Sequence, residues 1–251
     1  CIMINTIRNT VLAIVSKDNR GYITPEEFNL FARQTQLDLF GQYMYDYSNA
    51  INKQNARMHN SGYSDVPELL HEIIDKFLVE DVLVYNSTSD KFYVPGDNPG
   101  QPSEGKSYKI IRLTYNNTVE IEKVSPVKVL NLLSSSMVAP TDTYPVYVLN
   151  EYATGGDIQG IQVYPVTITS NVTINYLRYP LDPKWTYYTL LSDGAPVFNQ
   201  SASDFQDFEL PYTDAPRLVV GICKLAGVSI QETDVVQLMQ AEEVNDNQQK
   251  S

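Results

Sequence analysis

A signal for the start of a helix at Thr24 begins the longest regular pattern in the chain. Thr24 provides a capping hydroxyl, Pro25 suits the first helical position, and Glu27 occupies the position of a capping-box carboxylate. Apolar and aromatic residues then recur at helical spacing to about Met58. An unbroken helix of this length would be roughly 50 Å long, which is longer than a small domain is wide. We therefore expect one long helix of the kind that serves as a strut in a multi-subunit assembly.

Shorter helical patterns lie on both sides of this helix. Residues 4–16 carry isoleucine and valine at helical spacing and predict an amphipathic helix. A third helix is expected to start at Pro67 and to present Leu70, Phe77 and Leu78 to the core. The N-terminal part of the chain is therefore expected to be helical.

The pattern changes at Val82 and stays different to about Tyr188. Short runs of Val, Ile, Tyr and Thr alternate with Pro, Gly and Asn, which is typical of a small antiparallel sandwich or barrel. Ser125 and Pro126 predict one helix inside this region, ending near Leu133.

Helical spacing returns at Thr213 and is expected to end at Gly227, a C-capping glycine. The C-terminal arm, residues 228–251, has a few apolar positions among polar ones and could not bury enough apolar surface to stay ordered alone. We expect it to order by docking on a partner. Its candidate anchors are Val228, Ile230, Val235, Val236, Leu238 and Met239.

These patterns together predict an α+β fold in three parts. Residues 1–80 form an N-terminal helical region with the long helix, residues 81–212 a Tyr-rich antiparallel β domain, and residues 213–251 a C-terminal helix with an extended arm. Tyrosine combines an aromatic body with a polar tip, which suits both sheets and protein interfaces.

The charge of the chain argues against a surface that grips nucleic acid. There are 30 Asp and Glu against 18 Lys and Arg, a net charge of −12. Binding to phosphate backbones needs clustered Lys and Arg that displace counterions. We expect this chain to repel nucleic acid more than it holds it.

The apolar runs are too short for a membrane span. The longest is Val11–Val15, and others such as Leu218–Val220 are shorter, whereas crossing a bilayer takes about 20 residues. The first run is also too short for the core of a secretory signal. We expect no membrane contact and synthesis in a cytoplasm.

Residues 100–107 match the phosphate-loop pattern letter for letter. In a nucleotide site this loop must open directly into a helix, so that backbone N–H groups converge on the phosphates. Residues 108–113 instead favour a strand, and Pro102 lacks one of the N–H groups. We expect an exposed loop between strands, and we keep an enzyme that uses Lys106 and Ser107 as an alternative.

No other pattern predicts a catalytic, cofactor or metal site. Residues 16–27 imitate the end of a calcium loop, but Arg20 stands where a ligand is needed. Residues 71–75 resemble a zinc-protease helix, but His59 is the only other histidine and no credible third ligand exists. We expect no enzymatic activity, no cofactor and no metal.

Residues 176–185 contain the only tryptophan, Trp185, and a planar donor, Arg178. Pro180 and Pro183 would end a strand and fix an extended exit. Packing of Trp185 in the core is the favoured interpretation. A role for Arg178 and Trp185 at a partner interface is kept beside it.

Three phrases give the chain a resemblance to a known family. They are residues 3–31, residues 176–185, and a close that runs from Phe208-Glu209-Leu210-Pro211 through Ala226-Gly227-Val228 to a Gln- and Glu-rich tail. In these phrases the chain resembles structural proteins of crAss-like tailed bacteriophages, specifically ring or adaptor proteins of the head-to-tail connector. None of the three phrases is a catalytic signature.

The resemblance implies a virion structural protein that joins the portal to the tail and forms part of the DNA channel. It implies a homo-oligomeric ring of about a dozen copies that contacts the portal protein and adjacent connector or tail proteins. Genomic DNA would pass without tight binding, for which acidic walls are suited. The expected location is the head-tail junction of the virion, after assembly in the host bacterial cytoplasm. A tail hub or tail-tube subunit is the alternative within the same class.

Overall fold

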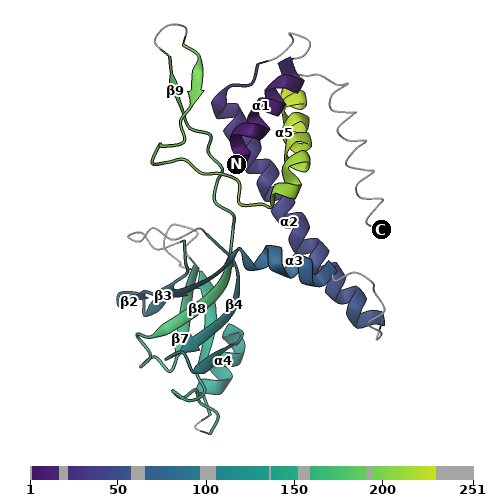
Figure 1. Cartoon of the computed structure of the whole chain (residues 1–251). Coiled ribbons are helices and arrows are strands. Elements are labelled where there is room, and N and C mark those ends of the chain that lie inside the picture. The colour runs from purple at the N-terminus through teal and green to yellow at the C-terminus, as the bar shows by residue number, and fades with distance from the viewer. Residues whose placement is uncertain are drawn as a thin grey trace. The chain divides into compact units, whose positions relative to one another are not determined.

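The structure is a computed structural model of the whole chain (Figure 1). It describes residues 2–16, 22–57, 66–96, 106–135, 137–151, 159–190 and 194–229. The chain forms two compact units, Cys1–Ile73 with Pro180–Ser251, and Ile74–Tyr179. We refer to the first as the helical unit and to the second as the sheet unit. Long helices and a large, mostly antiparallel sheet confirm the mixed α+β class.

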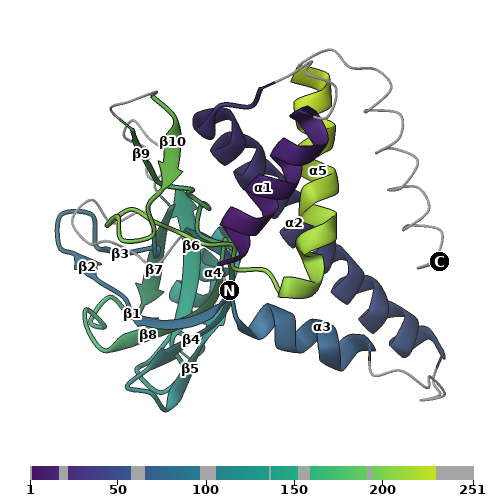
Figure 2. The ribbon, with the colours of Figure 1, turned by 45° about the horizontal axis from the view of Figure 1, so that its top comes forward.

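Three helices form the body of the helical unit. Helices α1 and α2 both pack against α5, and Figures 1 and 2 show α1 and α5 side by side along α2. A short hairpin of β9 and β10 completes the unit. The bounds are α1 (Met3–Val15), α2 (Pro25–Arg57), β9 (Tyr187–Thr189), β10 (Pro196–Phe198), the 3-10 turn η2 (Tyr212–Asp214) and α5 (Ala215–Ser229); α3 (Val66–Asp75) runs across the sequence boundary between the units.

Helix α2 begins where the sequence predicts, with a complete capping box. The Thr24 N–H donates to Glu27 Oε2 at 2.9 Å, and the Glu27 N–H donates to Thr24 Oγ1 at 3.2 Å. The Thr24 hydroxyl also donates to Glu27 Oε2 at 2.9 Å, and the two bonds from Thr24 to the carboxylate hold the pKa of Glu27 below its usual value. The helix then continues to Arg57, so the expected long helix is confirmed.

Helices α2 and α5 approach closely at Gly221. A Cβ placed on Gly221 would lie 2.4 Å from Thr35 Cγ2, a distance at which something must move. Helix α5 continues past Gly227 to Ser229, so the prediction that Gly227 caps the helix is wrong. The physical reason is tertiary packing, since the buried Ala226 keeps the last turns of α5 against the unit's core.

Polar contacts bind residues 181–214 to the N-terminal helices. The Gln36 side chain, almost fully buried, donates to Leu181 O at 2.8 Å and accepts the Glu209 N–H at 3.2 Å. Glu209 in turn accepts the Leu181 N–H at 2.7 Å. On the buried Asp214, Tyr43 donates to one carboxylate oxygen and Arg217 approaches the other at 3.4 Å.

The sheet unit contains eight strands in the order β1-β8-β4-β5-β6-β7-β3-β2. All neighbours pair antiparallel except β5 and β6, which are parallel and are joined through α4, since a parallel pair needs a crossover. The bounds are β1 (Leu78–Val82), β2 (Tyr85–Asn86), β3 (Lys91–Tyr93), β4 (Ser107–Tyr115), β5 (Val119–Lys123), α4 (Pro126–Leu133), β6 (Val146–Glu151), β7 (Gln159–Tyr164) and β8 (Val172–Arg178).

The sheet closes on itself at Leu83 and Val84, the two residues between its end strands β1 and β2. The Leu83 N–H donates to Val172 O of β8 at 2.8 Å, and Val84 O accepts the Tyr93 N–H of β3 at 3.0 Å. One continuous stretch of backbone therefore joins the two ends of the strand order. The sequence predicted a sandwich or a barrel, and the closed sheet corresponds to the barrel.

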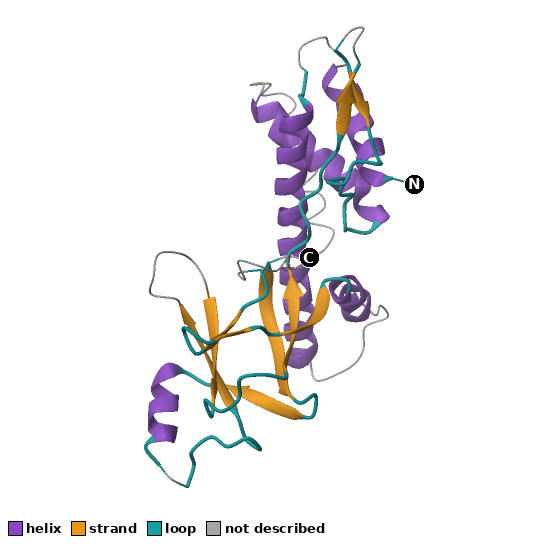
Figure 3. Cartoon of the chain, turned by 90° about the vertical axis from the view of Figure 1, so that its left-hand side faces the viewer, coloured by secondary structure: helices purple, strands orange, loops and turns teal. Residues whose placement is uncertain are grey.

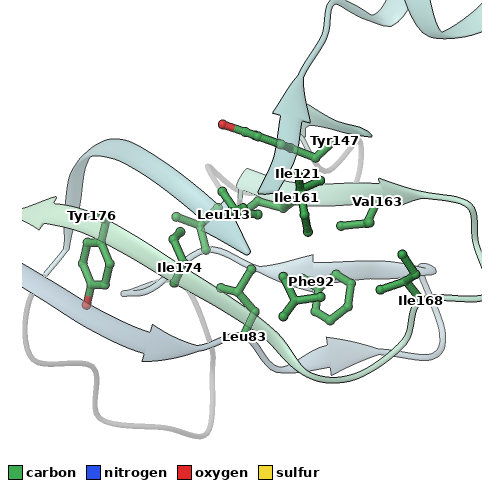
Figure 4. Close-up of a cluster of buried hydrophobic side chains, with 12 residues drawn as sticks. Leu83, Phe92, Leu113, Ile121, Tyr147, Ile161, Val163, Ile168, Ile174 and Tyr176 are labelled. Atoms are coloured by element: carbon green, nitrogen blue, oxygen red, sulfur yellow. The ribbon is translucent and has the colours of Figure 1, made fainter. Parts of the chain in front are cut away.

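Side chains from nearly every strand fill the interior of the closed sheet (Figure 4). Alternate residues of β8 point inward, as the period of two requires. The cluster contains Leu83, Phe92, Val94, Leu113, Ile121, Tyr147, Ile161, Val163, Ile168, Val172, Ile174 and Tyr176.

The end of α3 differs from the prediction. The Phe77 N–H donates to Ile74 O at 2.9 Å in a turn that ends the helix, and β1 starts at Leu78. Phe77 is buried as expected, but Leu78 is 43% exposed and lies in a strand. The prediction for Leu78 is wrong because apolar residues continue from the end of α3 into β1, so their spacing does not mark where the helix ends.

Candidate functional site

The described residues contain no group of three His, Cys, Asp or Glu side chains placed to hold a metal ion. Within the same residues, no helix combines the length and the apolar character that a bilayer crossing requires.

The phosphate-loop match leads into a strand. Ser107 is the first residue of β4, as the sequence predicted, and its N–H donates to Pro95 O at 3.2 Å. The carbonyl of Lys106 accepts the Tyr179 N–H at 2.8 Å. The backbone here is engaged in sheet pairing and offers no helix N-terminus to a phosphate. Residues 100–105 of the match lie outside the described residues.

Trp185 is a core residue of the helical unit, with only 2% of its surface exposed. Its Nε1–H donates to Asn5 Oδ1 at 3.1 Å, so the polar edge of the ring is satisfied internally. Tyr187 and Phe198 both lie nearly parallel to the ring at centroid distances of 5.7 Å. This placement is the core role that the sequence favoured.

The guanidinium of Arg8 lies over the same ring, 3.7 Å from its centroid. Arg8 is buried, and its Nε finds no hydrogen-bond partner among the described residues. Burial lowers the pKa of Arg8, and the nearby Tyr22 offsets part of this effect. The ring face of Trp185 is thus a main stabiliser of this buried cation.

Arg178 belongs to the other unit, as the last residue of β8. Its Nη1 donates to Tyr179 O at 3.2 Å, and its guanidinium carbon lies 5.8 Å from the centre of the Phe77 ring. Arg178 and Trp185, which are close together in the sequence, therefore belong to separate units.

The anchors expected in the C-terminal arm are only partly reached by the described residues. The backbone of Val228 belongs to the last turn of α5, but its side chain is outside the described part of the structure. Ile230, Val235, Val236, Leu238 and Met239 lie outside the described residues.

A surface that the sequence analysis missed lies on α4. Val127 and Leu130, one turn apart, are 71% and 69% exposed, while Val129 on the opposite face is buried. Val129 packs with Val124 and with Val146 and Val148 of β6. Figure 3 shows α4 at the margin of the sheet unit, with the unit's strands on one side of it. The outer face of α4 is therefore apolar and exposed.

Two further apolar side chains are exposed shortly after the end of the helix. Met137 is 95% exposed and Val138 also lies open to solvent. We call this surface the α4 patch. It consists of Val127, Leu130, Leu133, Met137 and Val138.

The composition of α4 carried a signal that could have revealed this patch. The helix reads Pro-Val-Lys-Val-Leu-Asn-Leu-Leu, so apolar residues occupy both of its faces. A helix that is apolar all round is normally buried on all sides. The capping residues Ser125 and Pro126 predict the helix but not this second apolar face.

Other exposed apolar side chains are more scattered. On β4, the register with β8 shifts at Tyr108 and at Ile111, and both side chains are exposed. The ring of Tyr108 meets that of Tyr179 edge to face at 5.2 Å. On α2, Leu30 and Tyr45 are exposed singly, which is ordinary for a protein surface.

No protein-family model matches the sequence, and no curated protein matches it.

Proposed function

We propose that this chain is a structural subunit of a tailed-bacteriophage virion, a ring or adaptor subunit of the head-to-tail connector. The observation that carries the proposal is the α4 patch, because a group of exposed apolar side chains is characteristic of a surface that contacts another protein. The sequence phrases that resemble connector proteins of crAss-like phages give the class of assembly.

The interior of the helical unit fits a structural role. Several of its buried polar side chains bond to distant parts of the same unit, as Gln36 does with Leu181 and Glu209. Trp185, just before β9, likewise contacts α1 through Asn5 and Arg8 and α2 through Asn29. Such contacts hold long segments in one geometry, which a subunit under mechanical load during DNA passage needs.

The net charge of −12 fits a channel component that must not retain DNA. A ring of such subunits would present repulsive walls to the phosphate backbone at close range. The proposed partners are further copies of this chain, the portal protein and the adjacent connector or tail proteins. The proposed location is the head-tail junction.

A cryo-EM map of the intact virion of the phage that encodes this chain is the direct test. We expect a closed ring at the portal vertex whose density accommodates the helical unit and the sheet unit of each copy. Density for the chain in the tail tube or hub would support the alternative structural role instead. Absence of the chain from purified virions, measured by mass spectrometry, would overturn the proposal.

A further inference from the structure

We propose that the α4 patch is a docking site for the C-terminal arm of a neighbouring copy of this chain. The inference rests on the proposed function, since it names one contact between subunits of the assembly. It concerns the part of the arm beyond α5, residues 230–251.

The α4 patch has the features of one side of a protein–protein interface. Val127 and Leu130 stand one turn apart on the exposed side of the helix, and the exposed Met137 and Val138 follow the helix end in the sequence. The other face of α4 is already held by Val129 against β6, so the helix has a fixed position. A rigid, apolar, convex helix face suits an amphipathic segment laid along it.

The charge around the patch indicates what kind of segment would bind. Residues 123–141 contain Lys123 and Lys128 and no Asp or Glu, in a chain whose net charge is −12. Lys128 has Glu122 3.6 Å from its Nζ, but both side chains are more than half exposed, so the pair is weak. The patch is therefore an apolar surface with two lysines beside it, between Glu122 and Asp142 in the sequence, and an apolar segment with acidic residues would complement it.

Residues 230–251 have this composition. Apolar residues group between Ile230 and Met239, and five acidic residues accompany them against the single Lys250. The acidic residues are Glu232, Asp234, Glu242, Glu243 and Asp246. The spacing of Val235, Val236 and Met239 places their side chains on one face if the segment is helical.

The contact would join two different surfaces of the same chain, an arm and a patch. Such a heterologous contact repeats from copy to copy and generates a closed ring when the rotation closes. This is the assembly that the proposed function requires, and it gives the arm of each copy a place on the next.

Peptide binding tests the contact in isolation. A fluorescent peptide of residues 230–251 is titrated with the protein truncated after Ser229, and its anisotropy is measured. We expect saturable binding that weakens as sodium chloride is raised, because part of the attraction is electrostatic. A peptide with Leu238→Ser and Met239→Ser should not bind, and no binding of the native peptide would overturn the proposal.

Leu130→Asp and Leu30→Asp form a matched pair of variants in the truncated protein. Both leucines lie on helices with similar exposure, 69% and 62%, but Leu30 is on α2 in the helical unit. We expect Leu130→Asp to weaken peptide binding by about tenfold or more and Leu30→Asp to leave it unchanged. Val127→Ser with Leu130→Ser, which adds no charge, should weaken binding in the same direction. Equal binding by all variants would overturn the proposed site, and circular dichroism checks that each variant is folded.

Cross-linking in the full chain identifies whose arm is bound. A photoreactive residue at position 238 is introduced, and isotopically light and heavy copies are mixed before illumination. Cross-links between light and heavy chains at residues 127–138 support the neighbouring-copy contact, whereas cross-links only within one copy overturn it. These measurements use purified protein, so failure here with the chain present in virions leaves the proposed function standing. Success here with the chain absent from virions would remove only the connector role.

Discussion

Asp207 caps the first turn of α1 although 204 positions in the sequence separate it from Met3. Its Oδ2 accepts the Met3 N–H at 2.9 Å, and its Oδ1 accepts the Ile4 N–H at 2.8 Å. No side chain near the start of the helix provides a cap, because the residue at the N-cap position is Ile2. A carboxylate from the far end of the chain thus satisfies two of the helix's free N–H groups and faces its positive end.

Asp207→Ala should lower the free energy of unfolding of the helical unit by about 1–2 kcal/mol, the usual cost of losing an N-cap. Chemical denaturation followed by Trp185 fluorescence measures it, since Trp185 is the only tryptophan and lies in this unit. Asp204→Ala is the matched control. Asp204 pairs with Lys184 at the surface, so its loss should leave the transition almost unchanged. Equal effects of the two substitutions would contradict the capping role.

Gly221→Ala should destabilise the helical unit by about 1–3 kcal/mol, although alanine favours helices more than glycine does. The new methyl group would meet Thr35 Cγ2 at 2.4 Å. Gly41→Ala on α2 is the control, because nothing lies within 4 Å of a Cβ there, and it should raise stability by up to about 1 kcal/mol.

Thr35→Ser tests the same contact from the other helix. It removes the methyl group that a Cβ on Gly221 would meet, so the double variant Gly221→Ala with Thr35→Ser should be more stable than the sum of the single effects predicts. Strict additivity in urea denaturation would mean that α2 and α5 do not meet at these residues.

Asn29→Ala should cost about 1–3 kcal/mol, because it leaves two backbone groups of Trp185 without partners. Asn29 Oδ1 accepts the Trp185 N–H at 2.8 Å, and Asn29 Nδ2 donates to Trp185 O at 3.3 Å. Gln34→Ala on the exposed side of the same helix serves as control, since its bond is to Asp38 only. The measurement is the midpoint of chemical denaturation followed by Trp185 fluorescence. Similar midpoints for both variants would contradict a stabilising role of the two bonds between Asn29 and Trp185.

Local signals in the sequence predicted the elements that neighbouring residues determine. The helix at Pro126–Leu133 has the expected bounds because Ser125 caps it through a bond from the Lys128 N–H at 3.3 Å. The attachment of residues 180–229 to α1 and α2 could not be read in this way. It depends on contacts such as Gln36 to Leu181, between residues 145 positions apart, and no periodic pattern encodes such pairs.

The apolar face of α4 is an intermediate case. Its residues were visible in the sequence, but which face packs on β6 was fixed only when β5 and β6 paired in parallel and brought Val146 and Val148 beneath Val129. The C-terminal anchors and the phosphate-loop residues 100–105 stay predictions, since they lie outside the described residues.

Lys106→Ala should have no effect on nucleotide binding, because we expect the full chain to bind no ATP with magnesium present. The strand β4 begins at Ser107, where a phosphate loop needs a helix. Isothermal titration calorimetry measures binding, with Lys109→Ala on the same strand as the comparison variant. Micromolar binding that is lost in Lys106→Ala and kept in Lys109→Ala would revive the packaging or ejection enzyme.

Alkaline pH should destabilise the helical unit through Cys223 and Tyr43. Burial raises the pKa of the Cys223 thiol to about 11, and burial together with the bond to Asp214 raises the pKa of Tyr43. Both groups are held neutral in the folded unit and ionise more readily in the unfolded chain, so their contribution to stability is complete below the unfolded pKa. For the thiol, stability should fall from about pH 8.5 and continue to fall until the folded pKa of about 11 is passed, at up to about 1.4 kcal/mol per pH unit.

Chemical denaturation between pH 8 and 11 tests this for Cys223→Ala, with Cys1→Ser as the control. The free energy of unfolding of Cys223→Ala should decline less steeply with pH than that of Cys1→Ser. Parallel pH profiles for the two variants would exclude ionisation of Cys223 as a source of the loss.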